Sequence, residues 1–246
     1  MKLVITQPNF VPWLGYFAQI HHSSKICFLD NVQYNRREWQ NRNRITSRTG
    51  KVSYITANIK KAKRNSLINT IELSENFYLE KLLNKVRENY YGSKFSKELI
   101  SYLEEGFRNA LKESNGNLSK LNVELIKYFC LLTDIKLNYS LASCFDQNSK
   151  NIKTPTENLI EICKIHKVDE YLSSIGAKEY MLPEIQKFNN SKIKVYWQIF
   201  NHSKYTEADR KKKFLSHLSI VDYLAHNSID SLKGYLESCH SEIEGN

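Results

Sequence analysis

The opening of the chain reads as a βαβ unit, and this unit constrains the fold more than any other feature of the sequence. An apolar run at residues 2–6 is typical of a short buried strand. Two prolines between residues 7 and 12 exclude a helix or a central strand there, and Pro12 suits the first turn of a helix. Large apolar side chains then recur at helical spacing over 13–20, and a second strand is predicted over 25–29. A parallel crossover is the expected connection.

Predicted strands continue to alternate with predicted helices, so the sequence indicates an α/β fold of Rossmann-like type, with a largely parallel sheet and flanking helices. With 8 Gly and 4 Pro, the chain is too poor in turn residues for a β-sandwich. One domain over residues 1–246 is predicted, with a helical insertion over 76–133 and a frayed last few residues. The further predicted helices cover 76–91, 94–113, 117–133, 156–167, 178–188 and 218–227, and the further strands 52–59, 66–73, 137–141, 170–173 and 192–199.

Positive charge is concentrated in one segment. The chain has a formal net charge of +10, and between Arg36 and Arg64 lie ten lysines and arginines against a single acidic residue, Glu38. Such a field attracts phosphate, pyrophosphate or nucleic acid, and arginine is the better bidentate phosphate ligand. A solvated loop in a lysine-rich protein is the alternative; the arginines of the first half favour a phosphorylated partner.

The remaining composition indicates a cytoplasmic protein. The five cysteines are widely spaced and none forms a CxxC pair, as expected for reduced thiols. Met1 leads directly into the first strand without a signal peptide, and no apolar run is long enough to span a bilayer.

The first candidate site is the turn between the first strand and the first helix. In open α/β sheets, ligands bind at the carboxyl ends of the strands, beside helix N-termini. Gln7 and Trp13 are its candidate binding residues, and Gly15 permits close approach of another group. The glycines of a Walker or dinucleotide loop are absent. A proline-stiffened turn with a core tryptophan explains the pattern equally well.

The second candidate site, residues 29–45, is dense in amide, guanidinium and aromatic side chains. Amides donate and accept hydrogen bonds, guanidinium groups grip phosphate or carboxylate, and aromatic rings stack on bases or sugars. Asp30, at a strand end, could orient an amine, act as a base or bind a metal; a helix cap or an ion pair is the commoner role.

The third candidate site follows the strand predicted at 170–173, where Ser173 and Gly176 precede a helix. It does not match a nucleophile elbow, and binding of a phosphate or acyl oxygen competes with simple capping by Ser174, which is preferred. The histidines show no metal-binding spacing, so no metal is predicted. The basic run 210–213 is read as a solvated turn rather than a nucleic-acid patch.

These blocks resemble a known family. QPNFVPWLGYFAQI with FLDNVQYNRREWQNRNRI, and the later YLSSIGAKEYM and FLSHLSIVDYLAHNS, are similar to the blocks of WbqC-like proteins, so the resemblance spans nearly the whole chain. It implies aminoacyl transfer, of glycine, onto a nucleotide-linked amino-deoxysugar in the biosynthesis of O-antigen or another surface polysaccharide. The donor would be an activated amino acid, such as an aminoacyl-tRNA; the resemblance does not specify a cofactor or an oligomeric state.

The resemblance also implies roles for individual residues. Asp30 would orient the amine or act as its base, and Asn43 would assist Arg42 and Arg44 in stabilising the oxyanion or binding phosphate. The three candidate sites and the resemblance together give these predicted substrate-binding residues: Gln7, Trp13, Gln33, Tyr34, Trp39, Asn41, Arg42, Arg44, Ser173 and Gly176.

Two other functions fit the residues. A Rossmann-like ligase would form an amide at the expense of ATP, although the HxGH-type signature is missing. A non-catalytic RNA or tRNA binder is permitted by the basic segment and its aromatic residues.

Overall fold

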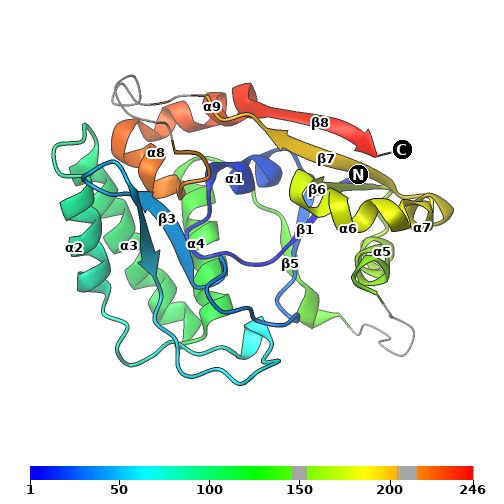
Figure 1. Ribbon diagram of the computed structural model, residues 1–246, viewed down its shortest axis with the longest axis horizontal. Coiled ribbons are helices and arrows are strands. Elements are labelled where there is room, and N and C mark those ends of the chain that lie inside the picture. Colours follow the sequence, from blue (N-terminus) through cyan, green and yellow to red (C-terminus); the bar gives the residue numbers. More distant parts are fainter. Residues whose placement is uncertain (146–153, 204, 206–214, 246) are drawn as a thin grey trace.

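A six-stranded sheet forms the centre of the computed structural model, which describes residues 1–145, 154–203, 205 and 215–245 (Figure 1). The strand order is β5-β2-β1-β6-β7-β8, and every pair is parallel except that of β7 with β8. This confirms the α/β, Rossmann-like prediction. The strands are β1 (Lys2–Thr6), β2 (Lys25–Phe28), β5 (Tyr139–Leu141), β6 (Glu170–Ser174), β7 (Lys194–Phe200) and β8 (His240–Gly245).

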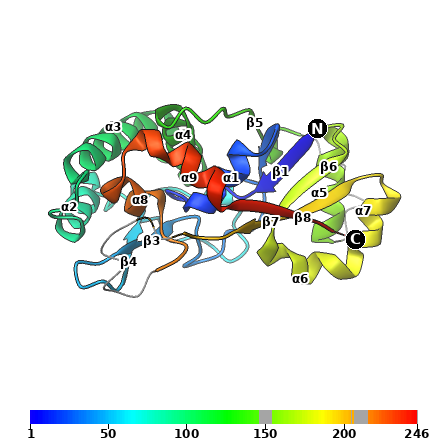
Figure 2. The same cartoon turned by 90° about the horizontal axis from the view of Figure 1, so that it is seen from above.

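Helices pack on both faces of the sheet because the buried side chains of β1 alternate between the faces. Val4 belongs to one core cluster, while Leu3 and Ile5 belong to the other. The larger core lies under α1 (Leu14–His21), α2 (Leu79–Asn89), α3 (Ser96–Ser114), α4 (Leu118–Leu132), α8 (Ile220–His226) and α9 (Leu232–Cys239). The smaller core lies under α5 (Pro155–Ile165), α6 (Lys178–Met181) and α7 (Ile185–Asn190), on the other side in Figure 2.

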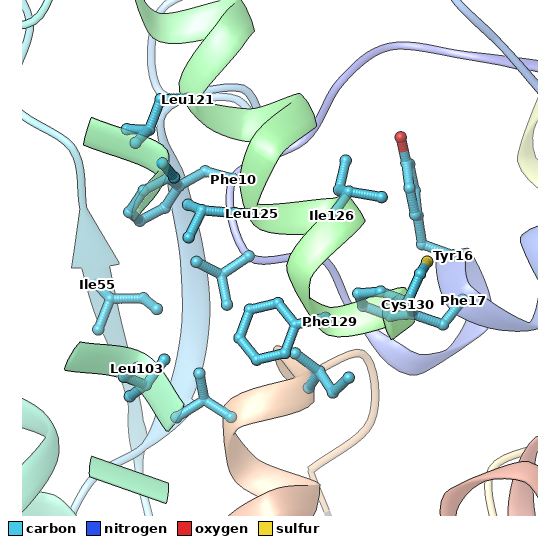
Figure 3. Close-up of a cluster of buried hydrophobic side chains, with 14 of the residues drawn as sticks. Phe10, Tyr16, Phe17, Ile55, Leu103, Leu121, Leu125, Ile126, Phe129 and Cys130 are labelled. Carbon is cyan, nitrogen blue, oxygen red and sulfur yellow. The ribbon is translucent and has the colours of Figure 1, made fainter. Parts of the chain in front are cut away.

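A small antiparallel hairpin lies against the helical layer. It consists of β3 (Arg42–Thr46) and β4 (Val52–Thr56). Ile55 of the hairpin packs in the same core as Phe10, Leu125 and Phe129, so the loop after β1, the hairpin and α4 share one apolar cluster (Figure 3). The helices predicted at 76–133 therefore contribute to the main core; whether they form an insertion within one domain stays a prediction.

Four local predictions are wrong. The segment 66–73 is not a strand: it contains the 3-10 turn Ile68–Thr70, and its buried residues are spaced for that turn. The predicted helix over 178–188 is broken at Pro183 into α6, a 3-10 turn at Leu182–Glu184 and α7. The segment His240–Gly245 is not frayed, because it pairs with β7. The fourth wrong prediction is the helix cap at Ser174, which belongs to the candidate functional site.

Two further findings agree with the sequence. Within the part of the chain that the structure describes, no helix is both long enough and apolar enough to cross a bilayer. All five cysteines are free thiols, and only Cys144 is exposed. The basic run 210–213 lies outside the described residues.

Candidate functional site

A cavity lies where the strand order reverses. Along the chain, β1 is followed by β2 and β5, which extend the sheet on one side of β1. The chain then returns, and β6 pairs with β1 on the other side. The loops after β1 and β6 leave this point in opposite directions, which opens a crevice at the carboxyl ends of the strands. A cavity of about 520 Å³ occupies it, and we call it the switch-point cavity. Its volume is in the range of small-molecule sites.

The loop after β1 forms one wall of the cavity and is fixed by hydrogen bonds from three other elements. Asn122 of α4 donates to the carbonyl of Pro8 at 2.8 Å, and Tyr16 donates to the carbonyl of Gln7 at 2.9 Å. The side chain of Gln40 donates to that of Gln7. The loop is thus preorganised.

Asn43 holds this loop in a strained conformation. Val11 has a φ of 40°, an outlier for a β-branched residue. The Asn43 amide donates to the carbonyls of Phe10 and Val11, each at 3.1 Å, and Ser219 donates to the Val11 carbonyl at 2.8 Å. The Asn43 amide oxygen accepts the backbone N–H of Arg44 at 2.8 Å. Asn43 lines the cavity, but these bonds make it a positioning residue for the loop.

Trp13 forms the floor of the cavity beside α1, and Gly15 makes that position available. A Cβ on Gly15 would lie 2.1 Å from the nearest Trp13 ring atom, so only glycine lets the indole lie on the helix backbone. The indole also contacts the ring of Phe200 edge-on, with centroids 5.5 Å apart. Gln198, from the same strand as Phe200, donates to the carbonyl of Gly15 at 3.0 Å.

Two histidines pack against the indole of Trp13. The ring centroids of His217 and His202 lie 4.7 and 5.4 Å from it. Burial, then His217, then Arg44 lower the pKa of His202 to about 4. Burial and, second, Arg44 also lower the pKa of His217. Both imidazoles are therefore neutral at pH 7, and a neutral imidazole is able to accept a proton. Of the two, His217 lines the cavity.

Arg44 supplies the positive charge of the cavity. Its guanidinium lies over the Trp39 ring at 5.2 Å, and both residues line the cavity. Within the described residues, Arg44 makes no ion pair and no acidic side chain lines the cavity. No acidic side chain of the described residues therefore neutralises this charge, and an anionic ligand group beside an aromatic ring is what this arrangement accommodates.

The opposite wall comes from the end of β6 and the turn before α6. Ser173 is buried and its hydroxyl accepts from the Tyr171 hydroxyl at 3.3 Å, whereas Ser174, Gly176 and Tyr180 are exposed along the cavity. The prediction that Ser174 caps the following helix is wrong, since its side chain makes no capping hydrogen bond there. The capping function fails because a 3-10 turn, Ile175–Ala177, precedes α6.

The structure brings together seven of the residues predicted from sequence. The predicted residues that line the switch-point cavity are Gln7, Trp13, Trp39, Asn43, Arg44, Ser173 and Gly176.

Five predicted residues lie outside the lining of the cavity. Asp30 is buried, and its carboxylate accepts from the backbone N–H and the hydroxyl of Ser143 at 2.9 and 2.6 Å. Asn41 donates to the carbonyl of Ala57 at 3.2 Å, and the Arg42 guanidinium lies 4.6 Å over the Tyr54 ring. The other two residues line a separate cavity: Gln33 and Tyr34.

Sequence reasoning missed several residues of the cavity. Gln198 and Phe200 end β7, and the rule that ligands bind at the carboxyl ends of strands would have found them. Tyr16 and Tyr180 lie in the first and third candidate sites of the sequence, but nothing in the sequence pattern singled out their side chains. His217 had no signal, because its position depends on the packing of residues 215–219 against Trp13.

Together, the sheet order and the cavity define a doubly wound α/β protein with a polar and aromatic cavity at its topological switch point. A family model described as the WbqC-like protein family matches residues 7–234, and the chain belongs to that family. It is also 28% identical over 240 residues to the uncharacterized protein Rv1507c of Mycobacterium tuberculosis, covering 97% of this chain and 98% of that protein. No solved structure matches it.

Proposed function

We propose that this protein transfers an aminoacyl group, glycine in the form that the resemblance implies, to the amine of a nucleotide-linked amino-deoxysugar during surface-polysaccharide biosynthesis. The observation that carries the proposal is the position of Arg44, which lies over Trp39 at the switch-point cavity and has no acidic partner among the described residues. A guanidinium grips a pyrophosphate, while Trp39 and Trp13 offer flat faces to the base and the sugar ring.

The chemistry of the step is amide formation. The neutral amine of the sugar attacks the carbonyl carbon of the activated aminoacyl donor. The C–N bond forms, the bond from that carbon to the leaving oxygen breaks, and the amine proton passes through a base to the leaving oxygen. His217 is the base that the geometry favours, because it lines the cavity and its lowered pKa keeps it neutral.

Asp30 has a different place in this proposal. Its carboxylate is occupied by two hydrogen bonds from Ser143, and it does not line the cavity. These contacts support a structural role for Asp30 more than the role of catalytic base that was predicted from the sequence. In the proposal, Asp30 joins the end of β2 to the turn Ala142–Cys144, and so acts on the architecture rather than on the substrate.

The experiment is a transfer assay read by mass spectrometry, with a nucleotide-linked amino sugar as acceptor and glycyl esters as donors. We expect a product heavier by one glycyl residue, and a His217→Gln variant that binds acceptor but turns over at least about tenfold more slowly. Full turnover by His217→Gln would remove the base assignment. Release of pyrophosphate from ATP together with glycine, and none with an ester, would favour the ligase over the transferase.

A further inference from the structure

A second cavity is lined mainly by cations and amides. It has a volume of about 360 Å³, and we call it the basic cavity. Its loops are joined by two hydrogen bonds: Arg36 donates to the Ala62 carbonyl at 3.0 Å, and the backbone N–H of Tyr34 donates to the Ser66 carbonyl at 2.8 Å. The lining residues are Gln33, Tyr34, Asn35, Arg36, Lys63, Arg64 and Asn65.

Within the part of the chain that the structure describes, acidic residues do not neutralise the charges around the basic cavity. Of the ten cations between Arg36 and Arg64, only Lys60 makes an ion pair among the described residues, with Glu72 at 2.8 Å. On a surface that is merely solvated, cations commonly alternate with acidic residues. The cations between Arg36 and Arg64 do not alternate in this way. Its field attracts a ligand with several negative charges.

Arg42 connects the basic cavity to the switch-point cavity. Burial raises the pKa of Tyr34, and the charges of Arg36 and Arg42 lie close enough to oppose that rise. On β3, Arg42 and Arg44 point to the same side because they are two residues apart, and Tyr54 of β4 pairs with Arg44. Arg42 is thus near Tyr34 of the basic cavity and lies over Tyr54, whose strand partner Arg44 lines the switch-point cavity.

A nucleotide sugar does not account for both cavities. It brings one pyrophosphate, which Arg44 and Trp39 accommodate in the switch-point cavity, and this leaves Arg36, Lys63 and Arg64 without an anionic partner among the described residues. A chain of phosphodiesters places a charge at each step and suits a groove in which cations alternate with stacking surfaces.

We infer that the basic cavity and the outer side of β3 bind the phosphates of a single-stranded RNA end, which carries the aminoacyl group as a ribose ester into the switch-point cavity. This inference rests on the proposed function and names its donor. The amine of the sugar attacks the ester carbonyl, the C–N bond forms, the carbon–oxygen bond to the ribose breaks, and the ribose hydroxyl leaves with the amine proton.

The test is binding of a fluorescent, unstructured RNA of about twelve nucleotides, measured by anisotropy over a series of salt concentrations. Each phosphate contact on a single strand contributes about −0.7 to the slope of log K against log salt. We expect the Lys63→Ala/Arg64→Ala variant to lose about 1.4 of that slope. The matched control is Lys97→Ala/Lys112→Ala, which removes two exposed cations of α3 and should leave the slope unchanged.

Two results would overturn the inference. One is an equal loss of slope in both variants, because net charge alone would then explain binding. The other is a Lys63→Ala/Arg64→Ala variant that binds RNA normally but loses affinity for uridine diphosphate, which would place the nucleotide in the basic cavity. The first result leaves binding of the nucleotide sugar at Arg44 untouched, whereas the second would also contradict that placement. The proposed function is judged separately, by loss of acceptor binding in Arg44→Ala.

Discussion

Gly15→Ala should close part of the switch-point cavity by displacing Trp13. The new methyl would lie 2.1 to 2.6 Å from three atoms of the indole, closer than any real contact, so the ring must move away from the helix. Overpacking of this kind costs about 1–3 kcal/mol, and the better helix propensity of alanine returns about 1 kcal/mol. We therefore expect a net loss of roughly 0–2 kcal/mol in the free energy of unfolding.

Ligand binding should suffer more than stability. Loss of an aromatic stack on the ligand costs about 0.5–1.5 kcal/mol, which is up to about a tenfold rise in Kd. Calorimetry with a nucleotide-linked amino sugar measures this. The control is Gly234→Ala in α9, where the added methyl meets nothing within 4 Å.

A double mutant identifies the indole as the cause. In a Trp13→Leu background the indole is absent, so Gly15→Ala should no longer destabilise the protein. The free energy of unfolding should instead rise slightly, because alanine has the better helix propensity. Urea unfolding of the four proteins in the cycle gives the coupling energy. An equal destabilisation by Gly15→Ala with and without Trp13 would refute the reasoning, because the strain would then come from elsewhere.

Three further predictions concern residues that support the structure around the switch-point cavity. Asp30→Asn places an amide opposite the donors of Ser143, and should cost about 1–3 kcal/mol of stability in urea unfolding while acceptor binding is retained; unchanged stability would contradict the structural role. Ser219→Ala removes the bond to the Val11 carbonyl and the cap of α8, and should cost about 1–2 kcal/mol by the same measurement. Because the pKa of His202 falls from 6.5 to about 4 on folding, the unfolded chain binds an extra proton between these values, and stability should fall as the pH drops through this window. His202→Gln should reduce that dependence of the unfolding midpoint, and an unaltered pH profile would exclude His202 as one of its sources.

The parts of the fold that the sequence predicts are those with a strong apolar pattern. β1 is a continuous apolar run that is buried on both faces, and the long helices bury one regularly spaced set of side chains, so both patterns are visible in the sequence. The strand β3, Arg42–Thr46, was missed because its outer face is cationic and its inner face mixes Ile45 with the amide of Asn43. β8 was missed for a similar reason, since this edge strand is polar and only half buried.

The candidate site was predictable where sequence position fixes spatial position. Gln7, Trp13 and Ser173 follow strands of a parallel sheet, so their meeting at one edge follows from topology. The separation of Arg44 from Arg36 did not follow, because the basic segment folds into a loop, a hairpin and a second loop that distribute its cations between two cavities. His217 comes to Trp13 only through tertiary packing.

The most direct test of the central claim is calorimetric titration of the protein with a nucleotide-linked amino sugar, comparing wild type with Arg44→Ala and Arg48→Ala. Both arginines belong to the basic segment, but only Arg44 lines the switch-point cavity. Removing a charged hydrogen-bonding group costs about 1.5–3 kcal/mol, so Arg44→Ala should weaken binding about 10- to 100-fold. Arg48→Ala should bind as wild type does. Equal affinities for all three proteins, or an equal loss in both variants, would contradict the placement of the substrate in this cavity.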